Sequence, residues 1–266
     1  MLAPLVVALT RPPEGFHAPG TEIFDYTDTC LIGSGDLCVT RITFWMLMSA
    51  VIISAIFVVA FRRPQIVPRG LQNAVESLVD FIRSGIVLEV MGREGLPFLP
   101  FLTSLFVFVW LNNLYGIIPG INFPTTARMA IPLFLAILVW FVFNIVGVVK
   151  QGGLHYLRNT LFPPGVPKPI YVLYTPIEFV TVFIVRPLTL SVRLTANMIA
   201  GHLMLTIFFV GTWYLQWKLV TIPVAALSFA LGTFITAFEV LVGVLQAYIF
   251  TILTAVYIAG AIHPEH

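Results

Sequence analysis

One cation stands in an otherwise apolar part of this sequence. Arg193 lies within residues 170–217, where the only other charged residues are Glu178 and Arg186. A guanidinium keeps its proton at any working pH, and a cation among lipid chains is costly unless a partner or a water-filled cavity receives it. The sequence therefore predicts that Arg193 is a functional residue and that it faces something other than lipid.

Other polar residues share a helix face with this arginine. Arg186 lies seven residues before Arg193 and Asn197 lies four residues after it, so a helix places all three on one face. Glu178 lies fifteen residues before Arg193, which is about four turns away on roughly the same face. We expect this stretch to form a helix with one thin polar seam.

The last apolar stretch of the chain carries a second seam. Glu239 and Gln246 are seven residues apart and fall on one face of a helix. Packed antiparallel, the two helices would form a ribbon with Arg193 near its middle. Gln246 is then expected to lie across the ribbon from Arg193.

The composition indicates the elements that must position these residues. The chain has 266 residues, of which 59% are hydrophobic and 10% are charged. A soluble domain of this length needs a more polar surface. Several apolar runs reach the ~20 residues that a helix needs to cross ~30 Å of hydrocarbon. The predicted fold class is therefore an all-α polytopic membrane protein, and no basic, aromatic patch suggests a nucleic-acid partner.

Five transmembrane spans are predicted, the last two being unusually long. They cover residues 42–61, 97–119, 128–149, 170–217 and 219–262. Each of the last two is roughly twice what one perpendicular crossing needs, so it is either two short helices or one long, strongly tilted helix. No polar loop divides the fourth, which favours two long tilted helices that form a hairpin. Residues 1–41 are expected to form an N-terminal arm and residues 42–266 a single membrane domain.

Basic residues indicate the orientation. The loops 62–95 and 150–169 hold eight Lys and Arg residues between them, against four on the opposite side. The positive-inside rule then places the N-terminus outside and the C-terminus in the cytoplasm.

Cys30 and Cys38, the only cysteines, would lie in the outer arm, where either a disulfide or two free thiols is possible.

Three motifs together resemble the family of a subunits of F-type ATP synthases, and its bacterial members in particular. The order and spacing of the motifs match those of the family over most of the chain beyond about residue 42. The motifs are Leu190-Ser-Val-Arg-Leu-Thr-Ala-Asn-Met-Ile-Ala-Gly-His202, Leu245-Gln-Ala-Tyr-Ile-Phe-Thr-Ile-Leu-Thr-Ala-Val-Tyr257 and Phe108-Val-Trp-Leu-Asn-Asn-Leu-Tyr-Gly-Ile-Ile-Pro119.

The resemblance implies a stationary proton channel in a bacterial plasma membrane. The expected partners are a rotating ring of c subunits, which carries one carboxylate on each hairpin, the b subunits of the peripheral stalk, the other synthase subunits and membrane lipid. The chain would be a non-catalytic subunit without a cofactor or a metal. Arg193 would be the fixed cation of the channel, since an opposite charge keeps a nearby carboxylate ionised whereas burial in lipid makes it neutral.

Protons would reach the ring along polar residues of the spans. The candidates for this path are Asn197, His202, Glu239, Gln246, Glu178 and Asn113. Members of the resembled family carry an ionisable pair at the positions of His202 and Glu239, which implies an outer half-channel at these two residues. His202 is nine residues from Arg193 and is expected on the opposite helix face.

Structural roles remain open for several candidates. Thr175-Pro176 before Glu178 is typical of a capping box at a helix start, so Glu178 is either a proton relay or a cap. The resembled family places an acid one residue closer to the arginine. Asn197 and Asn113 could join helices by hydrogen bonds, His202 could be a buried neutral imidazole, and Arg193 could pair with Glu239.

Two other classes of protein compete with a channel subunit. A secondary transporter would clamp an anionic substrate on Arg193, but inverted repeats and matching broken helices are not found in the sequence. A membrane-embedded enzyme would need a motif such as His-Glu-x-x-His or Gly-x-Ser-x-Gly, and the sequence contains neither. The sequence therefore favours the channel.

Overall fold

The computed structural model describes residues 20, 30–32, 39–118, 125–162, 170–217 and 219–262. Within these residues, five helical segments are long and apolar enough to cross a membrane, which confirms the all-α polytopic prediction. The segments are Ile42–Phe61, Gly92–Leu114, Ala130–Gln151, Tyr171–Leu215 and Ile222–Ile262. The second span differs from the predicted 97–119: it begins with a 3-10 turn at Gly92 and ends at Leu114, before the turn at 115–118.

The first span follows a small two-stranded antiparallel sheet. Strand β1 (Cys30–Ile32) pairs with β2 (Val39–Thr40), and helix α2 (Arg41–Phe61) begins directly after it. The Thr40 side chain caps α2 by accepting a hydrogen bond from the Thr43 backbone N–H at 3.4 Å. Cys38 and most of the predicted arm (residues 1–19, 21–29 and 33–38) lie outside the described residues, so the disulfide and the placement of the arm stay predictions.

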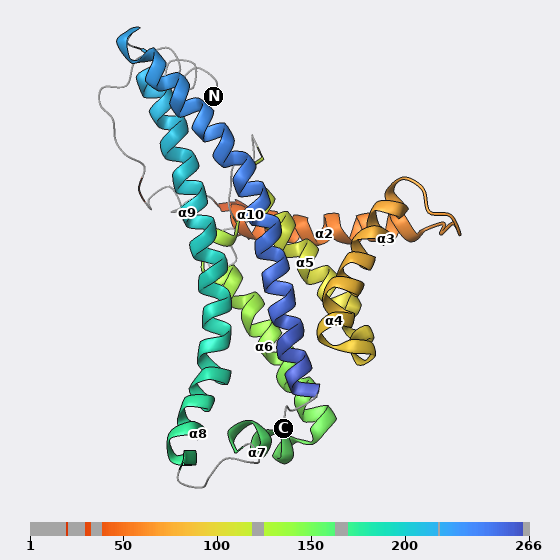
Figure 1. The fold of residues 1–266 in the computed structure, drawn as a ribbon. Helices are drawn as coiled ribbons and strands as arrows, with labels where there is room; N and C mark the ends of the chain where they lie inside the picture. Colours follow the sequence, from red (N-terminus) through yellow and green to blue (C-terminus); the bar gives the residue numbers. More distant parts are fainter. Residues whose placement is uncertain are drawn as a thin grey trace.

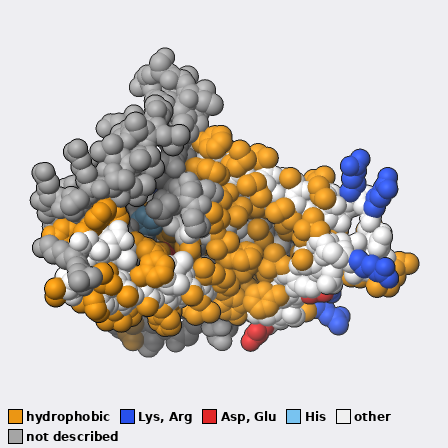
Figure 2. All heavy atoms as spheres, turned by 90° about the horizontal axis from the view of Figure 1, so that it is seen from above, with side chains coloured by type: hydrophobic (Ala, Val, Ile, Leu, Met, Phe, Trp, Pro, Cys, Tyr) orange, Lys and Arg blue, Asp and Glu red, His pale blue; other side chains and the backbone are white. Residues whose placement is uncertain are grey.

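Short helices connect α2 to the second span. Helix α3 (Leu71–Ile82) continues through the π turn η3 (Arg83–Val87) and α4 (Leu88–Val90) into the 3-10 helix η4 (Gly92–Phe98) and then α5 (Leu99–Leu114). Helix α3 is amphipathic, because Val75 and Ile82 are buried while its opposite side is polar. Figure 2 shows hydrophobic side chains over most of the visible described face, with Lys and Arg collected at the end that holds α3.

The third span ends in a short helix that folds back onto it. Between α6 (Ala130–Gln151) and α7 (Gly153–Leu161), Gly152 adopts a positive φ of 84°, which lets the chain turn. The Tyr156 ring packs on Gly147, where any Cβ would lie within 2.4 Å of the ring, and its hydroxyl donates to Asn144 Oδ1 at 3.2 Å. Burial raises the pKa of Tyr156 above its ordinary value, so the phenol keeps the proton that it donates.

The last two spans are long single rods. Helix α8 (Tyr171–Val180), the π turn η7 (Thr181–Val185) and α9 (Arg186–Leu215) follow one another without a break, and α10 (Ile222–Ile262) runs for 41 residues. At 1.5 Å per residue α10 is about 62 Å long, roughly twice the hydrocarbon thickness, so it must be strongly inclined. The expectation of two long helices rather than four short ones is confirmed.

The two long rods form the hairpin in which the candidate residues lie. Figure 1 shows α9 and α10 running side by side near their shared turn and separating toward the other end, where α6 contacts both of them. Large buried side chains fill the space between α5, α6, α9 and α10. They include Leu102, Val109, Val139, Phe143, Leu194, Phe250 and Ile258.

Candidate functional site

Arg193 lies on an open face of α9. The residues that follow it on the same face, at steps of three or four, are Ala196, Ala200, Met204 and Ile207, and all five side chains are exposed. Within the described part of the chain the one ion pair joins two other residues, Glu178 and Arg186, so Arg193 is not paired with Glu239. The guanidinium therefore faces outward from a membrane span without an acidic partner in this part of the chain.

His202 lies on the opposite side of the same helix. Its side chain is buried, with 4% exposed, and its imidazole hydrogen-bonds to the backbone of Gly116, just beyond the end of α5. The expectation that His202 does not share a face with Arg193 is confirmed. The imidazole is thus held behind the open face, between α9 and the turn after α5.

Glu239 is a buried acid in the middle of α10. Only 7% of it is exposed, and neither carboxylate oxygen has a hydrogen-bond partner among the described residues. Its carboxylate lies against Gly201 of α9, where an added Cβ would come within 2.6 Å of Glu239 Oε1. Because buried polar groups are normally paired, this acid at the α9–α10 contact is a candidate functional group.

Gly201 makes room for this carboxylate, and we predict that Gly201→Ala impairs proton translocation. The added methyl group would lie 2.6 Å from Glu239 Oε1, so the end of the Glu239 side chain must move out of its position against α9. ATP-driven dye quenching in inverted vesicles measures the effect. Gly85→Ala, in the π turn η3, is the matched control, since nothing lies within 4 Å of its added Cβ. Equal quenching in both variants would show that the close approach of Gly201 and Glu239 is not needed.

The register between α9 and α10, continued from two observed contacts, brings Arg193 nearly level with Gln246. Gly201 faces Glu239, and seven residues further along α9 Phe208 faces Gly232, seven residues back along α10. Continued in the other direction, the same antiparallel register brings Arg193 level with position 247, next to Gln246. Gln246 is buried, and its Nε2 atom has no hydrogen-bond partner among the described residues. Its predicted place near Arg193 is compatible with this register.

The two asparagines of the second span hold helices together. Asn113 Nδ2 donates to the Gly243 carbonyl of α10 at 3.3 Å, and Asn113 Oδ1 accepts from Thr126 Oγ1 at 3.0 Å. Asn112 Oδ1 accepts from Thr125 Oγ1 at 2.8 Å, and its Nδ2 donates to the Phe108 carbonyl of its own helix. These bonds fit a structural role for Asn113, and its place on the proton path stays a prediction.

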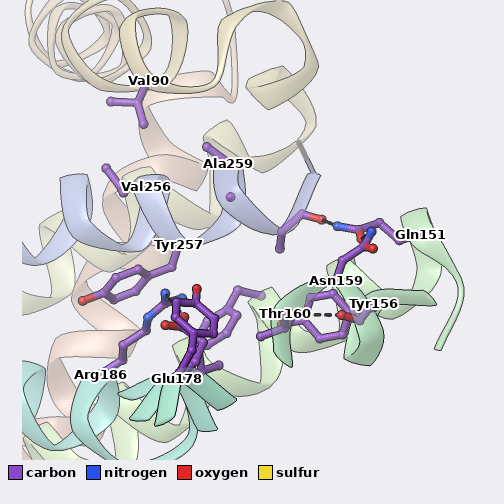
Figure 3. Close-up of a pocket in the computed structure, with 15 residues that line it drawn as sticks. Val90, Gln151, Tyr156, Asn159, Thr160, Glu178, Arg186, Val256, Tyr257 and Ala259 are labelled. Atoms are coloured by element: carbon purple, nitrogen blue, oxygen red, sulfur yellow. Dashed lines mark hydrogen bonds and ion pairs between the residues drawn. The ribbon is translucent and has the colours of Figure 1, made fainter. Parts of the chain in front are cut away.

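A cavity of about 720 Å³ lies at the other end of the hairpin. It is lined by side chains of α7 and α8 and by the last turns of α10. Glu178 Oε1 and Arg186 Nη2 are 3.6 Å apart in this cavity, and the Arg186 guanidinium lies 5.1 Å from the ring centre of Tyr257. Figure 3 shows Arg186 and Glu178 reaching together toward Tyr257. The cavity thus brings together a carboxylate, a guanidinium and a phenol.

The capping-box interpretation of Glu178 is wrong. Helix α8 begins at Tyr171, so Thr175 and Pro176 lie inside it and Glu178 is two turns from its start. The Thr175 hydroxyl donates instead to the Leu161 carbonyl at 2.9 Å, at the end of α7. Glu178 is therefore free of a capping role and pairs with Arg186.

Comparison with known proteins identifies the family. A sequence model of the ATP synthase A chain matches residues 43–259. The chain belongs to this family. ATP synthase subunit a of Rhodococcus erythropolis is 42% identical over 263 residues, covering 96% of this chain and 94% of the relative. The subunit of Frankia alni is 42% identical over 257 residues, covering 95% and 89%, and that of a Nocardioides species is 36% identical over 273 residues, covering 98% of both.

The candidate residues of this ATP synthase A chain family member fall into two groups. Glu178 and Arg186 meet in the cavity, while Glu239 lies against Gly201, the residue before His202. Arg193 lies between the two groups along the helix, and Asn197 is half-buried one turn beyond it. The sequence did not show that Tyr257 covers Arg186 or that Trp140 contacts the fourth span, because both contacts depend on how the helices pack.

Proposed function

We propose that this chain is the stationary proton-translocating subunit of a rotary F-type ATP synthase, with Arg193 as its essential fixed cation. The observation that carries the proposal is the outward-facing guanidinium on a membrane span, without an acidic partner in the described part of the chain. Such a cation is stable in a membrane only beside a group that the complex supplies. A ring of c subunits that presents a carboxylate to this face meets that requirement.

Electrostatics explains how Arg193 would couple proton movement to rotation. A ring carboxylate surrounded by lipid is neutral, because desolvation raises its pKa, whereas the same group beside a guanidinium loses its proton. Each carboxylate would therefore release a proton as it approaches Arg193 and bind one after it leaves. The fixed cation also prevents protons from passing directly between the two access paths. Each charge that crosses a potential of 100 mV supplies about 2.3 kcal/mol.

The two clusters of polar residues on either side of Arg193, Glu178 with Arg186 and His202 with Glu239, are the proposed half-channels. Glu178 lies about 22 Å before Arg193 along the helix and His202 about 14 Å after it, in opposite directions. The cavity with Glu178, Arg186 and Tyr257 lies beside α7, in the basic loop region 150–169, which the positive-inside rule assigns to the cytoplasm. His202 and Glu239 would then serve the outer side, with Asn197, Gln246 and Asn113 along the path.

The remaining parts of the proposal follow from the same assignment. The chain would be a non-catalytic subunit in a bacterial plasma membrane, with the N-terminus outside and the C-terminus in the cytoplasm. Its partners would be the c ring, the b subunits of the peripheral stalk, the other synthase subunits and lipid. Neither a cofactor nor a metal has a role in this mechanism.

Purification combined with cross-linking tests the proposal. We expect the chain to be recovered from mild detergent together with a ring of carboxylate-bearing hairpins and a soluble ATPase head. Met204→Cys, on the face of Arg193, should form a disulfide with a cysteine placed on the carboxylate-bearing helix of the ring. Val58→Cys, at a position on α2 that is more exposed than Met204, should not. A chain purified without the ring, or cross-linked equally at both positions, would contradict the proposal.

A further inference from the structure

The fourth span contains one turn that is wider than an α-helix. In the π turn η7 (Thr181–Val185) the Arg186 backbone N–H donates to the Thr181 carbonyl, five residues back instead of four. A single π turn of this kind takes up one extra residue within a helix while the helix continues on both sides. It lies between Glu178 and Arg186, the two charged residues of the cavity.

Pro187 explains why the wide turn forms here. Proline lacks an N–H, and its ring clashes with the carbonyl four residues earlier in a regular helix. The Val182 carbonyl then loses both of its possible donors in the helix. The Arg186 N–H bonds to Thr181, and the residue five positions after Val182 is Pro187 itself.

Trp140 replaces the missing donor from another helix. Its indole Nε1 on α6 donates to the Val182 carbonyl at 3.2 Å, and its ring packs edge-on against Phe183 at 5.8 Å. Val182 is 1% exposed, so its carbonyl would otherwise be a buried and unsatisfied acceptor. The indole thus stabilises the wide turn and joins it to α6.

The wide turn sets which side chains share a face. In a straight α-helix Glu178 and Arg186, eight residues apart, would point about 80° away from each other. With one residue taken up by the π turn they behave as if they were seven apart and point the same way. The structure agrees, because the two charged groups lie 3.6 Å apart and Glu178, Val182 and Arg186 line the same cavity.

We propose that the π turn Thr181–Val185, held by Trp140, is a positioning device that keeps Glu178 in register with Arg186 and Arg193. It also accounts for the offset of the acid, which lies one residue further from Arg193 than the resembled family leads one to expect. Trp140 acts through the helix backbone, and its own side chain does not line the cavity of Glu178 and Arg186. The readout by proton pumping rests on the function proposed above.

A deletion that removes the wide turn tests this device. Deleting Ile184 together with Pro187→Ala gives a regular helix in which Glu178, Arg186 and Arg193 keep their common face. We expect ATP-driven pumping within about twofold of the unchanged protein. The deletion removes one residue and the substitution removes the π turn that takes up one residue, so the relative directions of the three charged side chains stay the same. Deleting Leu188 with Pro187→Ala is the matched control, since both deleted side chains are exposed and aliphatic. With Leu188 deleted, either Arg186 or Arg193 leaves the face of Glu178, so pumping should fall at least about tenfold.

Trp140→Phe in both backgrounds separates positioning from packing. In the full-length chain it leaves the Val182 carbonyl unsatisfied and should lower pumping at least about threefold. In the chain without Ile184 and with Pro187→Ala, the N–H of residue 187 satisfies that carbonyl, so the hydrogen-bond part of the effect should vanish. Equal losses in the two backgrounds would assign Trp140 a packing role only and overturn the proposal.

The remaining outcomes distinguish this proposal from the function on which it rests. Loss of pumping, or failure to assemble with the synthase, after deletion of Ile184 with Pro187→Ala overturns the register device. Arg193→Ala in the same vesicles reports on the function separately. Pumping that survives Arg193→Ala overturns the function, whatever the deletions show.

Discussion

Replacing Arg193 with alanine should abolish ATP-driven proton pumping, and replacing it with lysine should lower pumping at least about tenfold. The guanidinium lies near the middle of its span, faces outward and forms no ion pair with any described residue. Without it, a ring carboxylate that arrives from lipid keeps its proton, because an opposite charge of this kind shifts a carboxylate pKa by about 1–3 units. Lysine retains a charge in water but can lose its proton in an apolar site, whereas arginine cannot.

Acridine-dye quenching in inverted membrane vesicles measures this loss. Arg128→Ala is the control, because Arg128 is also exposed but lies just before the start of the third span. It should pump as the unchanged protein does. Both variants must first be shown to contain the ring and the ATPase head in normal amounts. Normal quenching with Arg193→Lys would contradict the role of a permanent, fixed cation.

The membrane architecture could be predicted because its signals are local in the sequence. Residues 222–262 contain one charged residue, Glu239, and no polar loop, so a single long helix was the simplest outcome. The same argument placed Arg193 and His202 on opposite faces, since a helix fixes the angle between residues nine apart. The open face around Arg193 follows from the apolar residues that surround it.

The details of the site depend on how the helices pack against one another, which the sequence alone does not specify. Thr175-Pro176 has the composition of a helix start, but α7 packs on α8 and the Thr175 hydroxyl bonds to Leu161, so the helix begins a turn earlier. The contact between Gly201 and Glu239 requires a particular register of two helices that no periodicity within either helix specifies. The placement of the N-terminal arm and the disulfide depend on residues outside the described segments, so both stay predictions.

The wide turn in the fourth span is the feature that the sequence pattern predicts least well. At a constant 100° per residue, Glu178 would lie on roughly the face of Arg193 but about 80° from Arg186. In the structure Glu178 and Arg186 point the same way, because a π turn precedes Pro187 and the Trp140 indole of α6 donates to the free Val182 carbonyl. A proline inside a long apolar helix indicates where such a turn can form, but only the neighbouring helix decides whether its free carbonyl is satisfied.

Glu239→Gln should block proton translocation while leaving the complex assembled. Glutamine keeps nearly the size and shape of the side chain that lies against Gly201, so the contact between α9 and α10 is retained. A neutral amide is also less costly to bury than a carboxylate, so the fold should not lose stability. What the substitution removes is the ability to bind and release a proton at a buried site whose oxygens have no partner among the described residues. We therefore expect pumping to fall at least about tenfold, in the range that loss of one proton-transfer group causes.

The same substitution at another position controls for the general effect of replacing a glutamate with glutamine. Glu76→Gln alters the same side chain on α3, outside the spans, where Glu76 Oε1 accepts a hydrogen bond from Gln72 at 2.6 Å. It should leave pumping unchanged. Glu239→Asp retains a titratable group and should recover part of the pumping that the glutamine variant loses, although its shorter side chain leaves a gap at Gly201. If Glu239→Gln pumps as well as Glu76→Gln, the buried acid only fills space between the two long helices, and the outer path must use other residues.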